Sequence, residues 1–293
     1  MMFAEVYKMK LQEIHIRDPF ILFENKTYYL YGTRGKTCWG EQDGIDGYIS
    51  KDLENWDGPF EVFHKPEGFW ADRCYWAPEV HVYNHSYYMF ATFNNSLINK
   101  KGVLILQADK PLGPYHLHSE GKITPDQWNC LDGTFYLSQD KKPYMIFCHE
   151  WLDLVDGEMC YVQLSEDLKT AVSEPVRMVS ASEAKPWVRS VHMEETGSSY
   201  VTDGPFMYRK TDGELLMLWA SYGENGYVEA IARSDNGEID GHWTIDPKPL
   251  FDHDGGHGMI FADEKGKEYL VLHQPNDTPN ERPVLIPCDL NLF

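Results

Sequence analysis

The sequence predicts an all-β protein folded as a five-bladed β-propeller. A hairpin pattern occurs five times along the chain, spaced about fifty to seventy residues apart, and a second motif follows it at a similar distance. Such repeats are typical of propellers, in which each blade is a four-stranded sheet. The 293 residues show no helical periodicity of any length and no Pro/Ser-rich linker, so we expect one domain over residues 1–293.

Each repeat opens with an acidic or small polar residue, followed by a short apolar run, a polar turn and an aromatic-rich apolar run. Two β-rich runs around a turn that contains Asn, Asp, Gly or Lys are typical of a β-hairpin. The predicted hairpins begin at Asp18 (DPFILFENKTYYLYGT), Pro78 (PEVHVYNHSYYMFAT), Asp132 (DGTFYLSQDKKPYMIFCHEW), Asp203 (DGPFMYRKTDGELLMLWASY) and Gly256 (GHGMIFADEKGKEYLVLHQ).

A third apolar run follows four of the hairpins and ends at a Ser or Ala with acidic residues after it. These runs end near Ser50, Ala108, Ser165 and Ser234. The interval between the two motifs is 32 residues from Asp18 to Ser50 and 33 residues from Asp132 to Ser165. Such regularity favours the blades of one propeller over the unrelated hairpins of a β-sandwich.

The charge balance of the chain restricts its partners. Acidic residues outnumber basic ones, 46 against 26, for a formal net charge of −20. A field of this sign repels nucleic acids and anionic membrane surfaces, so we expect no nucleic acid and no membrane as a partner. The six cysteines are single and lack metal-finger spacing, so they are expected as free thiols. The sequence indicates no oligomeric state.

The first residues, MMFAEVYKMKLQEIHIRDP, contain no apolar stretch long enough for a signal peptide, and no later segment is long and apolar enough to span a bilayer. A cytoplasmic protein is therefore the default expectation. A secreted or periplasmic protein from which a signal peptide has been removed would show the same sequence.

The residues that open the five repeats are candidates for a functional site. In a propeller the innermost strand of each blade lines the central channel, so these residues are expected to meet at one mouth. They are Asp18, Glu79, Asp132, Asp203 and His257. Four acids at one mouth repel one another, so we expect raised pKa values or a bound cation. A turn-capping role is the alternative for each acid alone, whereas four in register favour a site.

The second strand of each hairpin runs antiparallel to the first and ends at the same mouth. This arrangement is expected to bring Glu150 and Trp151 there from the third repeat and His273 from the fifth. Glu150 lies in the sequence HEW, between an imidazole and an aromatic face of the size of a sugar ring. A surface Glu beside a packed Trp is the ordinary alternative.

A ring of acids is suited to glycoside hydrolysis. This reaction commonly needs one carboxylate to activate water or to attack the anomeric carbon, and one carboxylic acid to protonate the leaving oxygen. The two roles require unequal pKa values. A third carboxylate nearby can keep the acid protonated through like-charge repulsion.

These residues make the sequence similar to glycoside hydrolase family 43, whose members include β-xylosidases, α-L-arabinofuranosidases and arabinanases on a five-bladed propeller. The likeness extends through the whole chain. It implies that Asp18 in RDP is the catalytic base and that Asp132 in LDGTF tunes the acid. The segment WAPE, from Trp76 to Glu79, resembles the aromatic-Ala-Pro-acid segment of the second blade. The expected substrate-binding residues are Trp76, Glu79, Trp151, Arg282 and His273.

The fourth repeat departs from the family pattern. The general acid of the family is a Glu before Gly-Pro, and this chain has Asp203 in TDGPF, which is one methylene shorter. Proton transfer depends on hydrogen-bond distance, so three interpretations remain open. Asp203 donates the proton in a tighter site, or Glu150, Glu194 or Glu195 takes its place, or activity is lost. We prefer Asp203, followed by Glu150.

Two further residues carry roles implied by the resemblance. His257 in GGHGMIF is similar to an axial histidine that lies beside calcium or another ion in several members. Because hard cations prefer oxygen ligands, this would be an optional, mostly water-coordinated ion, and no cofactor is expected to be required. A histidine that is only hydrogen-bonded in the channel is the alternative. Arg282 in ERPV resembles an arginine that holds the substrate hydroxyls and the base, and a surface salt bridge is its alternative.

Several tryptophans are candidates for stacking on sugar rings, with core packing as the alternative for most. They lie in predicted loops and are Trp39, Trp70, Trp128, Trp151 and Trp187.

The resemblance implies an inverting glycosidase that removes terminal arabinofuranosyl or xylosyl residues from plant-type oligo- or polysaccharides. Inversion implies a carboxyl separation of roughly 6.5 to 9.5 Å between Asp18 and its acid. One alternative is a sugar-binding propeller without turnover, because Asp203 replaces the expected Glu. A glycosidase for another furanoside, such as galactofuranose, is a second alternative. The polar channel mouth disfavours a protein-binding scaffold.

Overall fold

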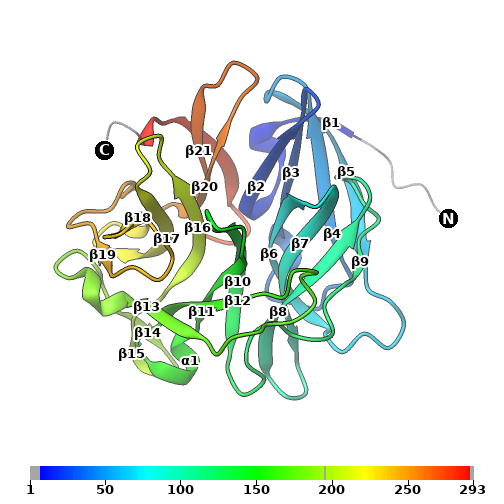
Figure 1. Cartoon of the computed structure of the whole chain (residues 1–293). Helices are drawn as coiled ribbons and strands as arrows, with labels where there is room; N and C mark the ends of the chain where they lie inside the picture. Colours follow the sequence, from blue (N-terminus) through cyan, green and yellow to red (C-terminus); the bar gives the residue numbers. More distant parts are fainter. Residues whose placement is uncertain (1–6, 195, 291–293) are drawn as a thin grey trace.

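The computed structural model describes residues 7–194 and 196–290, and it confirms the all-β fold and the five-bladed propeller. Five antiparallel sheets follow one another along the chain and stand around a common axis (Figure 1). Each predicted hairpin forms the first two strands of one blade.

The strands of each blade are consecutive in the sequence, apart from the N-terminal strand. Blade 1 contains β2 (Ile16–Glu24), β3 (Thr27–Arg34), β4 (Gly44–Ser50) and β5 (Asn55–His64), and β1 (Tyr7–Lys10) pairs with β5. Blade 2 contains β6 (Arg73–Tyr83), β7 (Ser86–Asn95), β8 (Lys100–Ala108) and β9 (His116–Leu117). Blade 3 contains β10 (Cys130–Leu137), β11 (Pro143–His149), β12 (Glu158–Gln163) and β13 (Val176–Ser180).

The other two blades follow a small hairpin of β14 (Val191–Met193) and β15 (Gly197–Ser199). Blade 4 contains β16 (Asp203–Arg209), β17 (Leu215–Gly223), β18 (Gly226–Ser234) and β19 (Trp243–Ile245). Blade 5 contains β20 (Gly256–Ala262), β21 (Glu268–Gln274) and β22 (Arg282–Pro287). The helical segments are short: α1 (Trp151–Leu154), η1 (Leu11–Glu13), η2 (Gly35–Thr37) and η3 (Ala181–Ala184).

Tight turns join the first two strands of the first two blades. Asn25 and Lys26, between β2 and β3, have φ of 49° and 57°, and Asn84 and His85, between β6 and β7, have φ of 45° and 65°. Two consecutive residues with positive φ form the type I′ turn, which matches the twist of the strands and favours Asn. The turns predicted at ENK and YNH are therefore confirmed.

The predicted ends of the third strands are also confirmed. Ser50, Ala108 and Ser234 are the last residues of β4, β8 and β18, and Ser165 lies two residues after β12. The hydroxyl of Ser50 accepts a hydrogen bond of 2.9 Å from the backbone N–H of Leu53. This bond offers the backbone an alternative to the sheet ladder and so helps to end the strand.

A β-bulge occurs at the same place in the first strand of every blade. Two residues of this strand stand opposite one residue of the second strand, and the first of the two has a positive φ. A bulge bends the strand and redirects a side chain. The five residues with positive φ are Asp18 (52°), Ala77 (45°), Asp132 (57°), Gly204 (54°) and His257 (55°).

The expectation of four acids in register was wrong at two positions. Ala77 occupies the bulge position of blade 2, and Glu79 lies beyond the bulge, paired with Phe90 of β7. Gly204 occupies the position in blade 4, so that Asp203 lies one residue before it and pairs with Ala220. Positive φ favours Gly at this position, but it cannot be read from a pattern of acidic residues.

The core fills the spaces between neighbouring blades. In β17, every residue from Leu215 to Ser221 is buried, because the strand is covered on both faces. Trp219 packs in a cluster with Ile146 of blade 3, whereas Leu218 packs in another cluster with Ile260 of blade 5. Alternate side chains of one strand thus bind two neighbouring sheets together.

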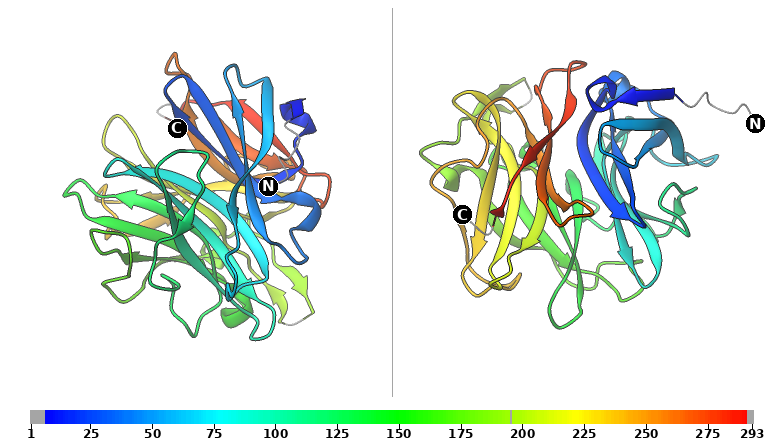
Figure 2. Two further views of the ribbon diagram at one scale, coloured as in Figure 1. Left: turned by 90° about the vertical axis from the view of Figure 1, so that its right-hand side faces the viewer. Right: turned by 90° about the horizontal axis from the view of Figure 1, so that it is seen from above.

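The ring closes between blade 1 and blade 5. Strand β2 contacts β20, β21 and β22, and both views of Figure 2 show the first blade beside the last. Among the described strands, none of blade 1 pairs with a strand of blade 5. The closure relies instead on side chains such as Arg17, whose Nη1 lies 2.8 Å from Oε1 of Glu281.

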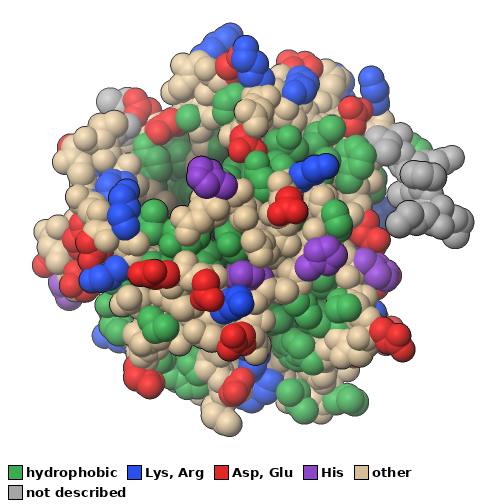
Figure 3. Space-filling view, turned by 45° about the vertical axis from the view of Figure 1, so that its right-hand side comes forward, with side chains coloured by type: hydrophobic (Ala, Val, Ile, Leu, Met, Phe, Trp, Pro, Cys, Tyr) green, Lys and Arg blue, Asp and Glu red, His purple; other side chains and the backbone are tan. Residues whose placement is uncertain are grey.

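Side-chain charges of both signs are interspersed over the face drawn in Figure 3, although the chain as a whole carries a net charge of −20. All six cysteines are free and five of them are buried, as the sequence predicts. Within residues 7–194 and 196–290, no helix has the length and apolar character needed to cross a lipid bilayer.

Candidate active site

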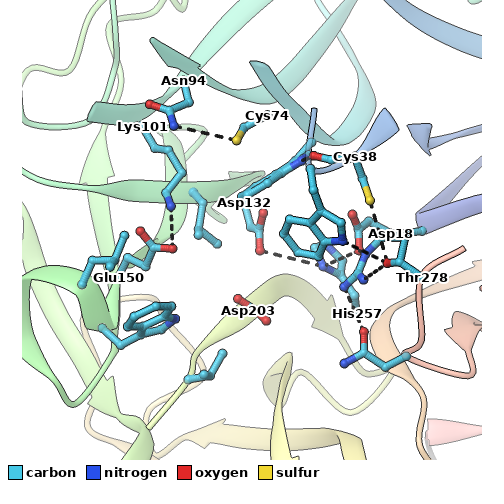
Figure 4. Close-up of a pocket in the computed structure, with 18 of the residues that line it drawn as sticks. Asp18, Cys38, Cys74, Asn94, Lys101, Asp132, Glu150, Asp203, His257 and Thr278 are labelled. Atoms are coloured by element: carbon cyan, nitrogen blue, oxygen red, sulfur yellow. Dashed lines mark hydrogen bonds and ion pairs between the residues drawn. The ribbon is translucent and has the colours of Figure 1, made fainter. Parts of the chain in front are cut away.

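A cavity of about 650 Å³ lies where the five blades meet, and each blade contributes residues to its wall. Seven of the residues predicted for the site line it: Asp18, Trp76, Asp132, Glu150, Trp151, Asp203 and His257. Figure 4 shows Asp132 and Asp203 between two groups of side chains, with Asp18 and His257 on one side and Lys101 and Glu150 on the other.

Asp18 is surrounded by hydrogen-bond donors and positive charge. The hydroxyl of Thr33 donates to Oδ2 of Asp18 at 2.6 Å, and Nδ1 of His257 lies 3.2 Å from Oδ1. Nε of Arg17 lies 3.9 Å from the same oxygen. Burial acts to raise the pKa of Asp18, but His257 and Arg17 outweigh it and hold this pKa below its ordinary value. Asp18 is therefore a carboxylate at neutral pH.

His273 positions the backbone of Asp18. Its Nδ1 accepts a hydrogen bond from the backbone N–H of Asp18 at 3.2 Å, and its Nε2 lies 3.2 Å from Oδ1 of Asn276. Burial lowers the pKa of His273 to about 3, so the ring is neutral and Nδ1 is free to accept. His273 therefore supports the backbone conformation at the bulge and does not form part of the cavity wall.

Asp132 and Asp203 are two further carboxyl groups in the wall of the cavity. Asp132 accepts a hydrogen bond from the backbone N–H of Gly204 at 3.0 Å, and Asp203 accepts one from the hydroxyl of Tyr227 at 2.9 Å. Burial raises the pKa of both residues, and repulsion from neighbouring carboxylates adds to the increase. Protonation of one member of this pair is therefore favoured while Asp18 stays ionised.

His257 provides a positive charge among these acids. Its Nδ1 lies 3.2 Å from Oδ1 of Asp18 and 3.8 Å from Oδ2 of Asp132. Burial opposes its protonation, but the carboxylates of Asp18, Asp132 and Asp203 raise its pKa above the ordinary value. The sequence suggested raised pKa values or a bound cation at this mouth, and the pKa values of Asp132 and Asp203 are raised.

A metal ion at His257 stays a prediction. Across the part of the chain that the structure describes, no group of three or more His, Cys, Asp or Glu side chains is arranged to hold a metal ion. Because Nδ1 of His257 faces two carboxylates, only its other ring nitrogen is left for an ion, whose remaining ligands would be water.

Glu150 lies in the cavity wall with a cation beside it. Its Oε1 is 2.8 Å from Nζ of Lys101, and its side chain is buried. Burial raises the pKa of Glu150, whereas Lys101 acts to lower it. A carboxylate held by an ammonium group is less suited to donate a proton than Asp203, whose Oδ2 accepts a hydrogen bond from a neutral hydroxyl.

Three predicted substrate-binding residues lie outside the cavity lining. Oε2 of Glu79 is 2.9 Å from Nε2 of His81, because the bulge at Ala77 sets Glu79 further along β6. His273 is fully buried behind Asp18. Arg282 donates hydrogen bonds to the backbone oxygens of Gln12 and Glu281. The expected contacts of Glu79, His273 and Arg282 with a ligand in this cavity are therefore not supported.

The tryptophans divide between the cavity and the core. Trp39 lines the cavity and is 60% exposed, and its ring meets that of Trp76 edge to face at 5.3 Å. Trp128 stacks on His149 at 3.9 Å. Trp70 and Trp187 pack against hydrophobic clusters. The packing interpretation therefore holds for the last three residues.

The two other acids considered as proton donors are not placed in the site. Glu194 is exposed in a turn and does not line the cavity, and Glu195 lies outside the described residues.

The sequence interpretation missed several residues of the wall. Arg17 donates hydrogen bonds of 2.8 Å to Glu281, 2.9 Å to Asn276 and 3.2 Å to Thr278, so it is the arginine beside Asp18, in place of Arg282. Other missed residues are Lys101, Tyr227, Asn276 and Thr278.

Comparisons with known proteins agree with this geometry. The sequence model described as "Glycosyl hydrolases family 43" matches residues 11–289. An endo-arabinase from Bacteroides thetaiotaomicron is 38% identical, with 96% of this chain and 97% of that chain covered and a TM-score of 0.88. No curated protein matches the chain.

Two more distant solved structures share the fold. An endo-1,4-β-xylanase from Bacteroides thetaiotaomicron is 21% identical, with 97% of each chain covered and a TM-score of 0.74. An α-L-arabinofuranosidase from Lactobacillus brevis is 16% identical, with 95% of this chain and 94% of that chain covered and a TM-score of 0.70.

Proposed function

The chain belongs to glycosyl hydrolases family 43, and we propose that it hydrolyses the arabinofuranosyl bonds of arabinan-type oligosaccharides with inversion at the anomeric carbon. Membership of the family makes the protein a glycoside hydrolase with a carbohydrate substrate. The choice of arabinofuranose rests on the similarity to the endo-arabinase, which is 38% identical over nearly the full length of both chains.

The observation that carries the proposal is the opposite shift of the pKa values in one cavity. The pKa of Asp18 is held low by His257 and Arg17 against the effect of burial, whereas burial raises the pKa of Asp203. A base and an acid with pKa values pushed apart are what general acid–base hydrolysis of a glycoside requires.

In the proposed reaction Asp18 takes a proton from water as the oxygen of that water bonds to the anomeric carbon. Asp203 gives its proton to the glycosidic oxygen as the bond between that oxygen and the anomeric carbon breaks. The products are a free sugar of inverted configuration and a chain with a new hydroxyl group. We expect the carboxyl groups of Asp18 and Asp203 to be roughly 6.5 to 9.5 Å apart, the separation that inverting enzymes use to admit water.

Asp132 and His257 act through these two groups. Repulsion between the carboxyl groups of Asp132 and Asp203 disfavours ionisation of both together, and repulsion from Asp203 adds to the burial that raises the pKa of Asp132. His257 balances the charge of Asp18 and orients it through the contact of 3.2 Å between Nδ1 and Oδ1. The aromatic faces of Trp39, Trp76 and Trp151 in the wall are suited to sugar rings.

The experiment is hydrolysis of a panel of p-nitrophenyl glycosides, with α-L-arabinofuranoside, β-D-xyloside and β-D-galactofuranoside as the three arms. We expect the arabinofuranoside to give the highest kcat/KM. Proton NMR in the first minutes should show the β-anomer of arabinose from the α-linked substrate. Release of the α-anomer first, or a preference for the xyloside or the galactofuranoside, would contradict the proposal.

The position of cleavage along the chain has two candidates. The sequence interpretation preferred removal of terminal units without fixing the position of cleavage, whereas the similarity to an endo-arabinase favours internal cleavage. Chromatography of the first products from linear α-1,5-arabinan distinguishes the two positions of cleavage. Arabinose alone indicates terminal removal, and a range of oligosaccharides indicates internal cleavage.

A further inference from the structure

The side of the cavity formed by blades 2 and 3 carries polar side chains that the proposed reaction does not use. Arg73 lies on β6, Asn94 on β7, Lys101 on β8, and Glu150 directly after β11. All four line the cavity. This part of the wall is thus built from three strands of blade 2 and from the residue that follows β11 of blade 3.

Three of these side chains have a buried polar atom without a hydrogen-bond partner within the described chain. The atoms are Nε of Arg73, Oδ1 of Asn94 and Oε2 of Glu150. Asn94 and Glu150 are each only 4% exposed. Leaving such an atom unpaired costs stability, and most buried polar atoms in folded proteins have a partner. Three of them around one cavity indicate a polar ligand.

Lys101 fixes the arrangement of this group. It is 7% exposed, and its Nζ lies 2.8 Å from Oε1 of Glu150 and 5.5 Å from the centre of the Trp76 ring. The ion pair holds one oxygen of Glu150 and leaves Oε2 for another donor. The indole of Trp76 provides an apolar face next to the polar atoms, a combination suited to a sugar ring.

The position of the group relative to the acids indicates which part of a substrate it would meet. Figure 4 shows Asp203 between Glu150 on one side and Asp18 with His257 on the other. Glu150 and Asp203 line the same cavity, and repulsion from Asp203 adds to the burial that raises the pKa of Glu150. In an inverting reaction the base and the acid act on opposite faces of the sugar. The leaving group therefore departs on the side of Asp203 that faces Glu150.

We propose that Arg73, Asn94, Lys101 and Glu150 form a subsite for the sugar residue on the leaving-group side of the scissile bond, and that this subsite makes the enzyme select oligosaccharides. The inference rests on the proposed hydrolysis with Asp203 as the acid. Donors on Arg73 and acceptors on Asn94 and Glu150 match the hydroxyl groups of a neutral sugar.

The test compares α-1,5-arabinotriose with p-nitrophenyl α-L-arabinofuranoside, whose leaving group has no sugar hydroxyls. In Lys101→Met and in Glu150→Gln we expect the ratio of kcat/KM for the trisaccharide to kcat/KM for the aryl glycoside to fall about tenfold, mainly through KM for the trisaccharide. The double variant Lys101→Met/Glu150→Gln removes both charges together. It therefore avoids the loss of stability that one unpaired buried charge would cause in a single variant.

Lys100→Met is the matched control, because Lys100 is the neighbouring residue on β8 and its Nζ donates to the backbone oxygen of Gln127 outside the cavity lining. We expect the same ratio in this variant as in the unmodified protein. A parallel loss of activity on both substrates in the Lys101 and Glu150 variants would overturn the proposal, because it would indicate only a structural role.

A binding measurement separates failure of the subsite from failure of the proposed function. Calorimetric titration of arabinotriose and of arabinose into Asp18→Asn, and into the same variant with Lys101→Met, needs no turnover. We expect the trisaccharide to lose about tenfold in affinity in the second protein, whereas equal affinity in both would overturn the subsite even if the unmodified enzyme hydrolyses arabinan.

Discussion

The roles proposed for Asp18 and Asp203 differ because the charges around the two carboxyl groups differ. Asp18 faces His257, Arg17 and the hydroxyl of Thr33, all of which favour its ionised form. Asp203 accepts a hydrogen bond of 2.9 Å from the neutral hydroxyl of Tyr227, and burial raises its pKa although His257 acts to lower it. The proposed assignment of base and acid therefore rests on the immediate neighbours of each carboxyl group.

Asp18→Asn should lower kcat by about 10²- to 10⁴-fold, the usual contribution of a general base, because an amide cannot accept the proton of water. The circular dichroism spectrum should stay that of the unmodified protein. Asp109→Asn is the control, because Asp109 is exposed and lies outside the cavity lining, and its kcat should not change. Activity retained in Asp18→Asn would remove Asp18 from the role of base.

The pH profile should respond to Tyr227→Phe. The hydroxyl of Tyr227 donates to Asp203 and so acts to lower the pKa of that acid. Removing it should raise the pKa of Asp203, so that the alkaline limb of the kcat/KM profile, where the acid loses its proton, moves to higher pH. Tyr161→Phe, at a half-buried position of β12 outside the cavity lining, is the control. An alkaline limb that stays in place or moves to lower pH would show that Asp203 does not set it.

How well the sequence predicts the site depends on the contacts involved. Asp18 and Asp132 could be predicted because they open repeated strands. Arg17 could not, since alternation along a strand places neighbours on opposite faces. The bulge, with φ of 52° at Asp18, breaks this alternation and brings both residues to the cavity. Lys101 and Glu150 meet across two blades, and neither residue has a local signal of that contact.

The repeated bulge is the structural element that builds the site. Its first residue has a φ between 45° and 57° in all five blades, a conformation that side chains other than Gly adopt at a cost. The chain places side chains with catalytic assignments there in Asp18, Asp132 and His257, and the small residues Ala77 and Gly204 in the other two blades. The strained backbone conformation thus occurs at residues whose side chains point toward the propeller axis.

Gly204→Ala tests this element. A Cβ at Gly204 would lie 2.7 Å from the ring of His257, and φ is 54°. The left-handed conformation costs an alanine roughly 1–2 kcal/mol, and the overlap with His257 should add about 1–3 kcal/mol to the loss in free energy of unfolding. Urea denaturation measures the loss.

Gly266→Ala is the matched control for the contact with His257. Gly266 has a φ of 78°, and a Cβ there would have no neighbour within 4 Å. This variant should therefore show only the conformational cost. Equal losses in Gly204→Ala and Gly266→Ala would mean that the contact of blade 4 with His257 is not tight.

Hairpins and third strands could be predicted because their signals are local: apolar runs, turn residues such as Asn25, and a Ser such as Ser50 at the strand end. The register of the first strands could not be predicted in the same way. Whether Ala77 or Glu79 faces the axis depends on where the bulge falls, and a bulge shifts every later side chain without a fixed sequence signal.

The whole molecule is a ring in which each blade is held by its two neighbours, and the cavity exists because the ring closes. Closure between blades 1 and 5 depends on side-chain contacts such as that of Arg17 with Glu281. Repeats along the sequence could predict the number of blades. They could not predict how the ring closes, since the contacts join residues from opposite ends of the chain.

A buried acid at the joint of blades 4 and 5 should make stability depend on pH. Glu229 is 0% exposed, and its Oε2 accepts the backbone N–H of Gly258 at 2.8 Å. Burial raises its pKa to about 8 from the ordinary value of 4.5. The folded state then keeps a proton that the unfolded chain releases, so this contribution is full below pH 4.5 and is lost as the pH rises through about 8.

Glu229→Gln should remove this dependence, because the amide carries no titratable proton and can still accept the N–H of Gly258. Between about pH 4.5 and pH 8, the free energy of unfolding should fall less steeply in the variant than in the unmodified protein. Urea denaturation at several pH values measures the slopes. The exposed Glu174 provides the control Glu174→Gln, which should keep the original slope, and an unchanged slope in Glu229→Gln would contradict the account.

The most direct test of the roles assigned here is the leaving-group dependence of Asp203→Asn. Without its proton donor, the enzyme should lose about 10²- to 10⁴-fold in kcat/KM on arabinotriose, but much less on 2,4-dinitrophenyl α-L-arabinofuranoside, whose leaving group needs no proton. Equal losses on the two substrates would show that Asp203 is not the acid, and the expected pattern in Glu150→Gln instead would assign that role to Glu150.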